Sequence, residues 1–364
     1  MPGHEQPTRL YFAYGSNLNA ADWEDWCQRK GFARGLLAFH SCGYLPDWDL
    51  AFDHFSTSRQ GGTLNIRPRV GQAVPGVIFE VRGDGWHALD QKEGAPRHYR
   101  RIDTVAQNDN GQLIRVSTYR ARGCGDHVPP TDEYLAIVRE ALEHHGFDSE
   151  MLQAAATNQQ TPWTTDAVFC YGTLMRGESR FPTLARCDIR CILLAEACGR
   201  LVDLGSFPGR IHSGESDGRV QGEFIRLGDF GEAVPTLDAI EGFRGYDDES
   251  SLYRRVLIGV GVGEGRVRLA WTYVLGTHLA SAPVIPSADW REHRGSRDEF
   301  LRALLAAYAQ TLGQDGWGSL VRRLQALDAG PQPWDSTTLF EALRDGRVSE
   351  RRLAQATGHW HVVP

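Results

Sequence analysis

The chain has 364 residues, a length that usually means two or more domains, and 41% of its residues are hydrophobic, enough to form buried cores. Its formal net charge of −7 and its pI near 6.0 argue against a protein that binds nucleic acid. No apolar run is long enough for a membrane span, and the polar N-terminal residues 1–8 lack the apolar stretch of a secretion signal.

The number and spacing of the cysteines bear on the cellular compartment in which the protein is expected. Seven are scattered along the chain, an odd number that suits a reducing cytoplasm better than a disulfide framework. Cys187 and Cys191 are four residues apart, but no neighbouring ligands complete a zinc site. We therefore expect a cytoplasmic protein without a bound metal.

The first predicted unit spans residues 8–147. Short apolar runs broken by Gly, Pro and Asp indicate strands and turns, among them a buried strand at 76–81 and an alternating strand at 115–119. A helix is predicted to begin after Thr131, an N-cap residue, because apolar residues recur at helical spacing from Tyr134 to Leu142. Gly146 suits the end of that helix.

Residues 148–166 are polar and rich in Ala, Thr and Gln, and are predicted to be a linker. The second unit, residues 167–279, again has the patterns of strands. The runs 253–262 and 266–275 flank Gly263-Glu264-Gly265, which is typical of a β-hairpin. Because a strand pattern follows these glycines, they do not indicate a dinucleotide-binding loop, which needs a helix there.

Residues 280–364 are predicted to form a helical C-terminal extension that has no counterpart after the first unit. Ser296 and Glu299 make a capping box before an apolar stripe, and shorter helices are predicted at 338–343 and 349–356. Since an amphipathic helix must bury its stripe, we expect a packing cover for the second unit or for the domain interface. The alternatives are a lid or a contact in a homo-oligomer.

A pair of motifs occurs twice along the chain. Tyr14-Gly15-Ser16-Asn17 follows one short apolar run, and Tyr171-Gly172-Thr173-Leu174 follows another. Downstream of each lies Leu-Asp-x-x-Glu-Gly, with its glutamate at Glu93 in the first copy and at Glu241 in the second. Recurrence in the same order at similar spacing predicts a tandem duplication of one domain, each copy holding a small ligand beside one carboxylate.

The repeated residues suit one kind of chemistry. A strand that ends in Tyr-Gly-Ser or Tyr-Gly-Thr and turns sharply exposes consecutive backbone N–H groups, which can bind a carboxylate or an oxyanion. Apolar neighbours place Glu93 and Glu241 near the ends of short helices, where partial burial raises a carboxyl pKa and suits it to proton transfer. Asp90 and Asp238, three residues earlier, could instead serve as helix caps. No nucleophile–histidine arrangement is visible, so one acid/base carboxylate per unit is the simplest chemistry.

On these motifs both units resemble the gamma-glutamylcyclotransferase superfamily. The first unit resembles the gamma-glutamylcyclotransferase branch at residues 11–18, 61–66, 76–79 and 89–94, and at the Pro129-Pro130 helix start. The second resembles the gamma-glutamylamine cyclotransferase branch at residues 168–177, 204–209, 220–223, 237–242 and 270–273. The resemblance covers residues 8–279 and leaves the C-terminal extension outside.

The resemblance implies an α+β fold with two tandem mixed β-barrels. It also implies that the α-amino group of a small-molecule gamma-glutamyl substrate attacks its own side-chain carbonyl, releasing 5-oxoproline and a free amine without a cofactor. Glu93 and Glu241 would be the general acid/base groups. The two turns would form part of the substrate pockets, with Tyr14, Gly15, Ser16 and Asn17 in the first unit and Tyr171, Gly172, Thr173 and Leu174 in the second. Four further tyrosines would line the pocket walls, although a tyrosine at such a place is more commonly a core residue: Tyr99 and Tyr119 in the first unit, and Tyr253 and Tyr273 in the second.

The two copies differ where Leu174 replaces Asn17, so the pockets would differ in substrate, or one would be degenerate. We expect both glutamates to be competent because both signatures are intact. One alternative is removal of a gamma-glutamyl cap from a biosynthetic intermediate. Another is a non-catalytic protein that binds a gamma-glutamyl compound in one or both barrels. The identity of the leaving amine is left open.

Overall fold

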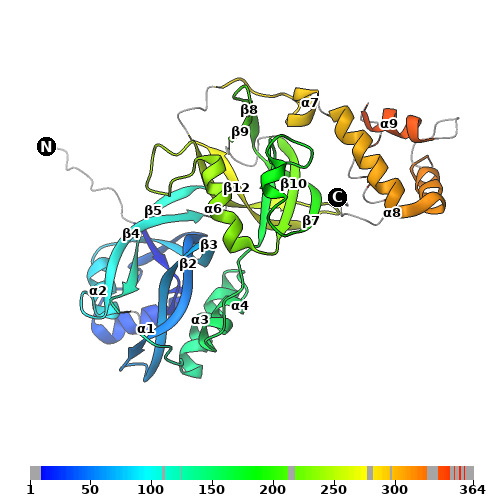
Figure 1. Ribbon diagram of the computed structural model, residues 1–364. Coiled ribbons are helices and arrows are strands. Elements are labelled where there is room, and N and C mark those ends of the chain that lie inside the picture. Colours follow the sequence, from blue (N-terminus) through cyan, green and yellow to red (C-terminus); the bar gives the residue numbers. More distant parts are fainter. Residues whose placement is uncertain are drawn as a thin grey trace. The chain divides into compact units, whose positions relative to one another are not determined.

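The computed structural model describes residues 10–108, 111–123, 125–211, 218–276, 282–295, 297–325, 335–344, 348, 352–353 and 356. The chain divides into two compact units, Met1–Thr164 and Thr165–Pro364. Each unit contains a closed five-stranded barrel with both parallel and antiparallel pairs, flanked by helices (Figure 1). The predicted α+β architecture of two tandem mixed barrels is therefore confirmed. No helix among the described residues is long and apolar enough to cross a membrane.

The first barrel has the strand order β1-β3-β2-β4-β5. Antiparallel pairing joins most neighbours, and β5 closes the barrel by pairing parallel to β1, with Leu10 opposite Val116. The strands are β1 (Leu10–Ala13), β2 (Leu37–Ser56), β3 (Gly61–Val81), β4 (Tyr99–Asn108) and β5 (Leu113–Ala121). The buried strand predicted at 76–81 is the end of β3, and the alternating strand predicted at 115–119 lies in β5.

The same close approach shapes both barrels. A Cβ at Gly76 would lie 2.2 Å from the carbonyl oxygen of Ala13, and a Cβ at Gly222 would lie 2.4 Å from that of Cys170. Both contacts are far below any allowed separation. A glycine is therefore required at this position of the strand that pairs antiparallel with the short first strand of each unit, so that the two strands can pack closely.

Helices cover the first barrel. They are a 3-10 turn η1 (Ser16–Leu18), α1 (Ala20–Lys30), α2 (Gly85–Glu93), α3 (Asp132–His144) and α4 (Glu150–Ala156). The predicted N-cap of α3 is confirmed, because the Thr131 side chain accepts a hydrogen bond from the Tyr134 N–H at 3.3 Å. The buried face of α3 carries the predicted apolar residues, including Val138.

The segment predicted as a linker, residues 148–166, differs from that prediction. Part of it forms α4, whose residues Met151, Leu152, Ala155 and Ala156 are buried in the core of the first unit. The short alanine-rich run has too few turns to show a clear apolar stripe in the sequence, and tertiary burial decides its structure.

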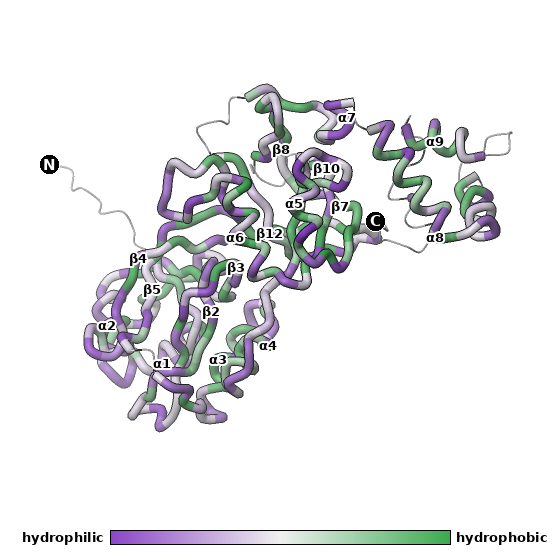
Figure 2. Tube along the Cα trace, in the orientation of Figure 1, coloured by the Kyte–Doolittle hydropathy of each residue, from purple (hydrophilic) through white to green (hydrophobic). Residues whose placement is uncertain are grey.

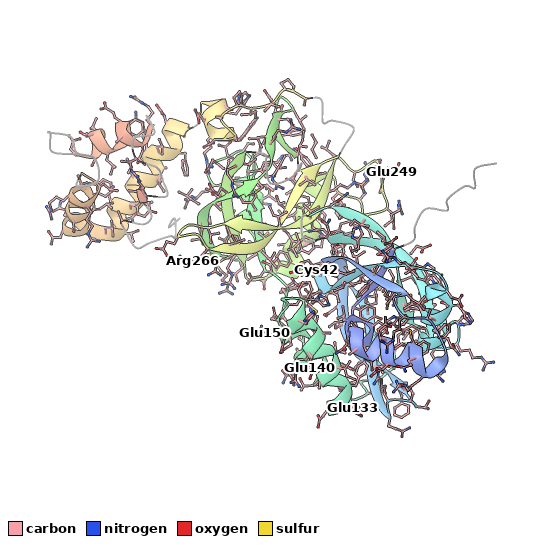
Figure 3. The ribbon with its side chains drawn as sticks, turned by 180° about the vertical axis from the view of Figure 1, so that it is seen from behind. Cys42, Glu133, Glu140, Glu150, Glu249 and Arg266 are labelled. Carbon is pink, nitrogen blue, oxygen red and sulfur yellow. The ribbon has the colours of Figure 1, made fainter. Side chains whose placement is uncertain are left out.

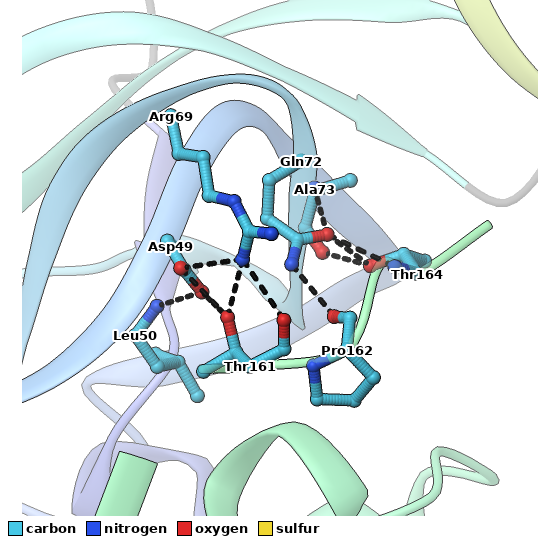
Figure 4. A network of polar contacts seen from close by, with 8 residues as sticks. All are labelled: Asp49, Leu50, Arg69, Gln72, Ala73, Thr161, Pro162 and Thr164. Atoms are coloured by element: carbon cyan, nitrogen blue, oxygen red, sulfur yellow. Dashed lines mark hydrogen bonds and ion pairs between the residues drawn. The ribbon is translucent and has the colours of Figure 1, made fainter. Parts of the chain in front are cut away.

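Residues 161–164 are held on the first barrel by polar contacts (Figure 4). The Thr161 hydroxyl donates to Asp49 at 2.6–2.7 Å and accepts from Arg69 at 2.7 Å. The buried Gln72 amide donates to the Pro162 carbonyl and accepts from the Thr164 N–H. The first unit therefore reaches to Thr164.

The second barrel has the order β10-β6-β12-β11-β7. Its strands are β6 (Ala167–Cys170), β7 (Ile189–Cys198), β10 (Arg219–Leu227), β11 (Tyr253–Gly261) and β12 (Val267–Leu275). The predicted hairpin is confirmed, since β11 and β12 pair antiparallel from Tyr253 opposite Leu275 to Gly261 opposite Val267. A two-stranded sheet, β8 (Arg200–Asp203) with β9 (Pro208–Ile211), and the helices α5 (Phe181–Leu184) and α6 (Phe230–Glu241) complete the barrel domain.

The C-terminal extension is helical, as predicted. It contains α7 (Trp290–Arg294), α8 (Arg297–Gln325), which is broken at Gly313, and α9 (Ser336–Arg344). Apolar and polar stretches alternate along α8 and α9 (Figure 2), and their apolar residues, among them Leu304 and Leu339, form a buried cluster against which Leu194 of β7 packs. The predicted cap residue Ser296 and most of the predicted helix at 349–356 lie outside the described residues.

Candidate active site

The first motif forms a turn at the end of β1. The chain leaves Ala13, passes through Gly15 and enters η1, whose bonds run from the Leu18 and Asn19 N–H groups back to Gly15 and Ser16. In the described part of the chain the Ser16 and Asn17 N–H groups donate no hydrogen bond. The turn therefore presents unused backbone donors, as the sequence suggested.

Glu93 is the last residue of α2, which ends at Gly94 in the left-handed conformation. The Asn17 amide nitrogen donates to Glu93 Oε1 at 2.8 Å and to the Tyr11 hydroxyl at 2.9 Å. Burial raises the pKa of the Glu93 carboxyl above its usual range, and the nearby Lys92 ammonium and the Asn17 donor partly offset that rise. Asn17, predicted as a substrate contact, thus also links the turn directly to the glutamate.

A cavity of about 610 Å³ opens beside this pair. All of the residues predicted for the first site line it: Tyr14, Gly15, Ser16, Asn17, Glu93, Tyr99 and Tyr119. The phenols are anchored in the barrel, because Tyr14 donates to the Tyr119 carbonyl at 2.6 Å and Tyr99 to the Leu64 carbonyl at 2.7 Å. Their rings therefore form fixed walls.

Asp90 is not a helix cap. Its Oδ1 accepts a hydrogen bond from the Tyr119 hydroxyl at 2.6 Å, and its Oδ2 pairs with the Arg101 guanidinium at 2.5 Å. Tyr119, whose carbonyl accepts the hydrogen bond from the Tyr14 hydroxyl, therefore also holds the helix that carries Glu93. Two hydrogen bonds through one residue connect the turn to the glutamate helix.

The second unit repeats this arrangement. Tyr171 donates to the Tyr273 carbonyl at 2.6 Å, and the Tyr273 hydroxyl donates to Asp238 at 2.7 Å. Asp238 pairs with the buried Arg255 at 2.8 Å, so it is not a cap either. The Thr173 and Leu174 N–H groups are likewise unused among the described residues. The residues predicted for this site line one cavity: Tyr171, Gly172, Thr173, Leu174, Glu241, Tyr253 and Tyr273.

The two sites differ in size and polarity. The second cavity measures only about 30 Å³, and Arg180, Phe207 and Pro208 also line it. Leu174 offers Glu241 no hydrogen bond comparable to that of Asn17. Burial accordingly raises the pKa of Glu241 to about 7, with Arg180 opposing the rise.

Sequence reasoning missed several residues that line the sites. In the first site they include Tyr11, Arg59 and Tyr134. In the second they include Arg180, whose guanidinium donates to the Ile240 carbonyl at 3.3 Å. Tyr11, Phe207 and Pro208 belong to segments that carried the resemblance, and Tyr134 belongs to the helix predicted after Thr131, so these residues had a signal in the sequence. Arg59 and Arg180 lie in no motif.

Comparison with known proteins gives a consistent result for both units. The family model described as "Gamma-glutamyl cyclotransferase, AIG2-like" matches residues 11–136 and 168–292. The gamma-glutamylcyclotransferase of Homo sapiens is 26% identical over 167 residues, covering 44% of this chain and 85% of the human protein. The Mus musculus protein is 26% identical over 186 residues, covering 49% of this chain and 94% of its own length.

Solved structures are similar at lower levels. A gamma-glutamyl cyclotransferase structure has 24% sequence identity and a TM-score of 0.36, and the match covers 42% of this chain and 89% of that one. YkqA from Bacillus subtilis has 15% identity and a TM-score of 0.29, and the match covers 73% of this chain and 83% of that one.

Proposed function

This chain belongs to the gamma-glutamyl cyclotransferase, AIG2-like family, and from that premise we propose that it releases 5-oxoproline and a free amine from a gamma-glutamyl amide. The observation that carries the proposal is the Asn17–Glu93 hydrogen bond of 2.8 Å in the wall of the 610 Å³ cavity. It joins an acid/base carboxylate to a turn with unused N–H donors. We also propose that the protein acts in the cytoplasm, as its cysteine pattern suggests.

The chemistry needs positioning more than reactive groups. The turn at Gly15 and Ser16 would hold the substrate α-carboxylate or the developing oxyanion with its N–H groups, so that the chain stays curled for ring closure. The α-nitrogen then forms a bond to the γ-carbonyl carbon, and the bond from that carbon to the leaving nitrogen breaks.

Glu93 would move the protons. The α-ammonium group carries three protons, and the ring nitrogen of 5-oxoproline keeps one. The other two pass to the leaving nitrogen, which departs as an ammonium ion. Burial raises the pKa of Glu93, so its carboxylate holds a proton more readily than an exposed one, which suits it to accept and return protons in this role.

The second unit supports the same reaction with less room. Glu241, Tyr171 and Thr173 repeat the first arrangement, but a cavity of about 30 Å³ has space for little more than one water molecule. We propose that substrate enters there only after Phe207 and Pro208 move. Leu174, which offers Glu241 no hydrogen bond, also favours a second candidate role, a unit that binds a small compound without turnover.

The direct test is product formation. The full chain is incubated with gamma-glutamyl-amino acids, gamma-glutamyl-ε-lysine and other gamma-glutamyl amines, and 5-oxoproline is measured. Product from at least one of them supports the proposal. Absence of product from all of them, with a correctly folded protein, contradicts it.

A further inference from the structure

The first cavity is much larger than a curled gamma-glutamyl group needs. Beyond the glutamate and the turn it continues between the end of α1 and the turn that joins β2 to β3. We call this part the outer chamber and define it by Trp26, Arg29 and Lys30 of α1 and by Phe55 and Arg59 at the β2–β3 turn. Its position beyond the reacting groups assigns it to the amine half of the substrate.

The outer chamber is a property of the first unit. Its wall exists because the first turn is followed by the 11-residue helix α1, whereas only the four-residue helix α5 lies between the second turn and β7. The second cavity accordingly ends at Arg180, Phe207 and Pro208. Any selection among substrates by the outer chamber therefore applies to those that react beside Glu93.

Positive charge dominates the chamber. Arg29 and Lys30 are exposed and, among the described residues, form no ion pair or side-chain hydrogen bond. Arg59 and Lys92 also line the cavity, and each forms an ion pair of 2.8 Å with Asp22. Together, Arg59, Lys92 and Asp22 carry one net positive charge.

Negative charge is scarce around the same cavity. The acidic residues that line it are Glu93, which serves the reaction, and Glu133, which lies in the first turn of α3 (Figure 3). A cavity wall with an excess of one sign of charge raises the local concentration of ligands of the opposite sign.

The two unpaired cations lie far from the turn. The helix α1 starts directly after η1, and Arg29 follows Ala20 by nine positions, so it lies roughly 13 Å further along the helix axis. Trp26, one helical turn earlier, and the half-exposed Phe55 offer apolar contact on the way. The chamber therefore suits an apolar chain that ends in an anion.

We propose that the outer chamber selects gamma-glutamyl amides whose leaving amine carries a carboxylate or phosphate remote from its nitrogen, held by Arg29 and Lys30. The inference rests on the proposed function and names the class of its substrate. An anion next to the nitrogen, as in a gamma-glutamyl α-amino acid, would not reach these two cations.

The test compares leaving amines that each contain six carbons. The probes are gamma-glutamyl-6-aminohexanoate, gamma-glutamyl-hexylamine, mono-gamma-glutamyl-1,6-diaminohexane and gamma-glutamyl-6-aminohexyl phosphate, which end in a carboxylate, a methyl group, an ammonium and a phosphate. We expect the anionic probes to exceed the hexylamine probe about tenfold in kcat/KM, mainly through KM, and the ammonium probe to be the poorest. The comparison of carboxylate with phosphate identifies which anion is preferred. High salt should shrink the preference.

The double variant Arg29→Gln/Lys30→Gln should bring the anionic-to-neutral ratio close to one. Arg100→Gln, which removes an exposed cation of the first unit outside the cavity, should keep the wild-type ratio. Equal kcat/KM for the anionic, neutral and cationic probes would overturn the inference while leaving the proposed reaction intact. A ratio unchanged in the double variant would also overturn it, because the two cations would then only complement the dipole of α1. Absence of 5-oxoproline from every probe would instead count against the proposed function.

Discussion

The Tyr119 hydroxyl donates a 2.6 Å hydrogen bond to Asp90, and the same tyrosine receives the Tyr14 hydroxyl on its carbonyl oxygen. The second unit repeats both bonds with Tyr273, Asp238 and Tyr171. One residue thus holds the glycine turn on one side and the glutamate-bearing helix on the other. In each unit this contact fixes where the turn lies relative to the helix that carries Glu93 or Glu241.

Loss of the Glu93 carboxylate should abolish most of the activity. Glu93→Gln keeps the shape but cannot transfer a proton, and we expect kcat to fall by about 10²–10⁴. Glu241→Gln should have a small effect on the total rate, because the second cavity measures only about 30 Å³. Release of 5-oxoproline from the single and double variants measures the share of each unit. A Glu93→Gln variant as active as the wild type would show that another group moves the proton.

Asp90→Asn tests the connection between turn and helix. The change removes the ion pair with Arg101 and weakens the bond from Tyr119, so α2 should shift and kcat should fall by about tenfold with KM little changed. Asp103→Asn is the matched control, since Asp103 accepts a 2.6 Å bond from Ser117 on the same pair of strands. Equal losses in the two variants would point to a general loss of stability.

Asn17→Leu should move the pH dependence of the first site. The Asn17 donor favours the ionised carboxylate and lowers the pKa of Glu93, so its removal raises that pKa. The acid limb of the kcat/KM profile should therefore move to higher pH. In Leu174→Asn the opposite change is expected, with the pKa of Glu241 falling from about 7. To separate the two sites, the Asn17→Leu profile is measured in a Glu241→Gln background and the Leu174→Asn profile in a Glu93→Gln background. If the acid limb of the Asn17→Leu profile stays at the same pH, the role of Asn17 is contradicted.

Glu241 should also make stability depend on pH. The pKa of Glu241 is about 7 in the folded chain, against 4.5 for an ordinary glutamate carboxyl. As the pH rises from 4.5 to 7, the carboxyl ionises in the unfolded chain before it does so in the folded chain. The free energy of unfolding therefore falls over this pH range. Glu241→Gln removes this loss. It should stabilise the second unit by roughly 2–3 kcal/mol more at pH 8 than at pH 5. Thermal or urea unfolding at the two pH values measures the difference, and an equal effect at both would be the contrary result.

Thr161→Val tests how the first unit holds its last residues. The change leaves Asp49 and Arg69 without the buried hydroxyl that bonds to both, and should reduce the unfolding free energy by about 1–3 kcal/mol. Thr157→Val is the control, because the exposed Thr157 hydroxyl bonds only to carbonyls of its own helix. Urea unfolding followed by far-ultraviolet circular dichroism measures the change. Matching losses in both variants would remove any special role for the buried contact.

Local patterns were sufficient for several features. The N-cap Thr131, the hairpin around Gly263 and the position of each glutamate at a helix end all depend on residues close together in the chain, where sequence spacing and contact coincide. The alanine-rich helix α4 was missed because its burial, and not its pattern, makes it helical.

The repeated motifs were enough to identify a duplicated domain in which each copy pairs a glycine turn with a glutamate, because both motifs recur intact. The folded chain was needed to show that Asp90 and Asp238 hold their helices through tyrosines and that Asn17 binds Glu93. It was also needed to show that the first cavity measures about 610 Å³ and the second about 30 Å³. These contacts join strands and helices that are distant in the chain. Their geometry follows from barrel closure and from close packing across the whole unit, which no local spacing records.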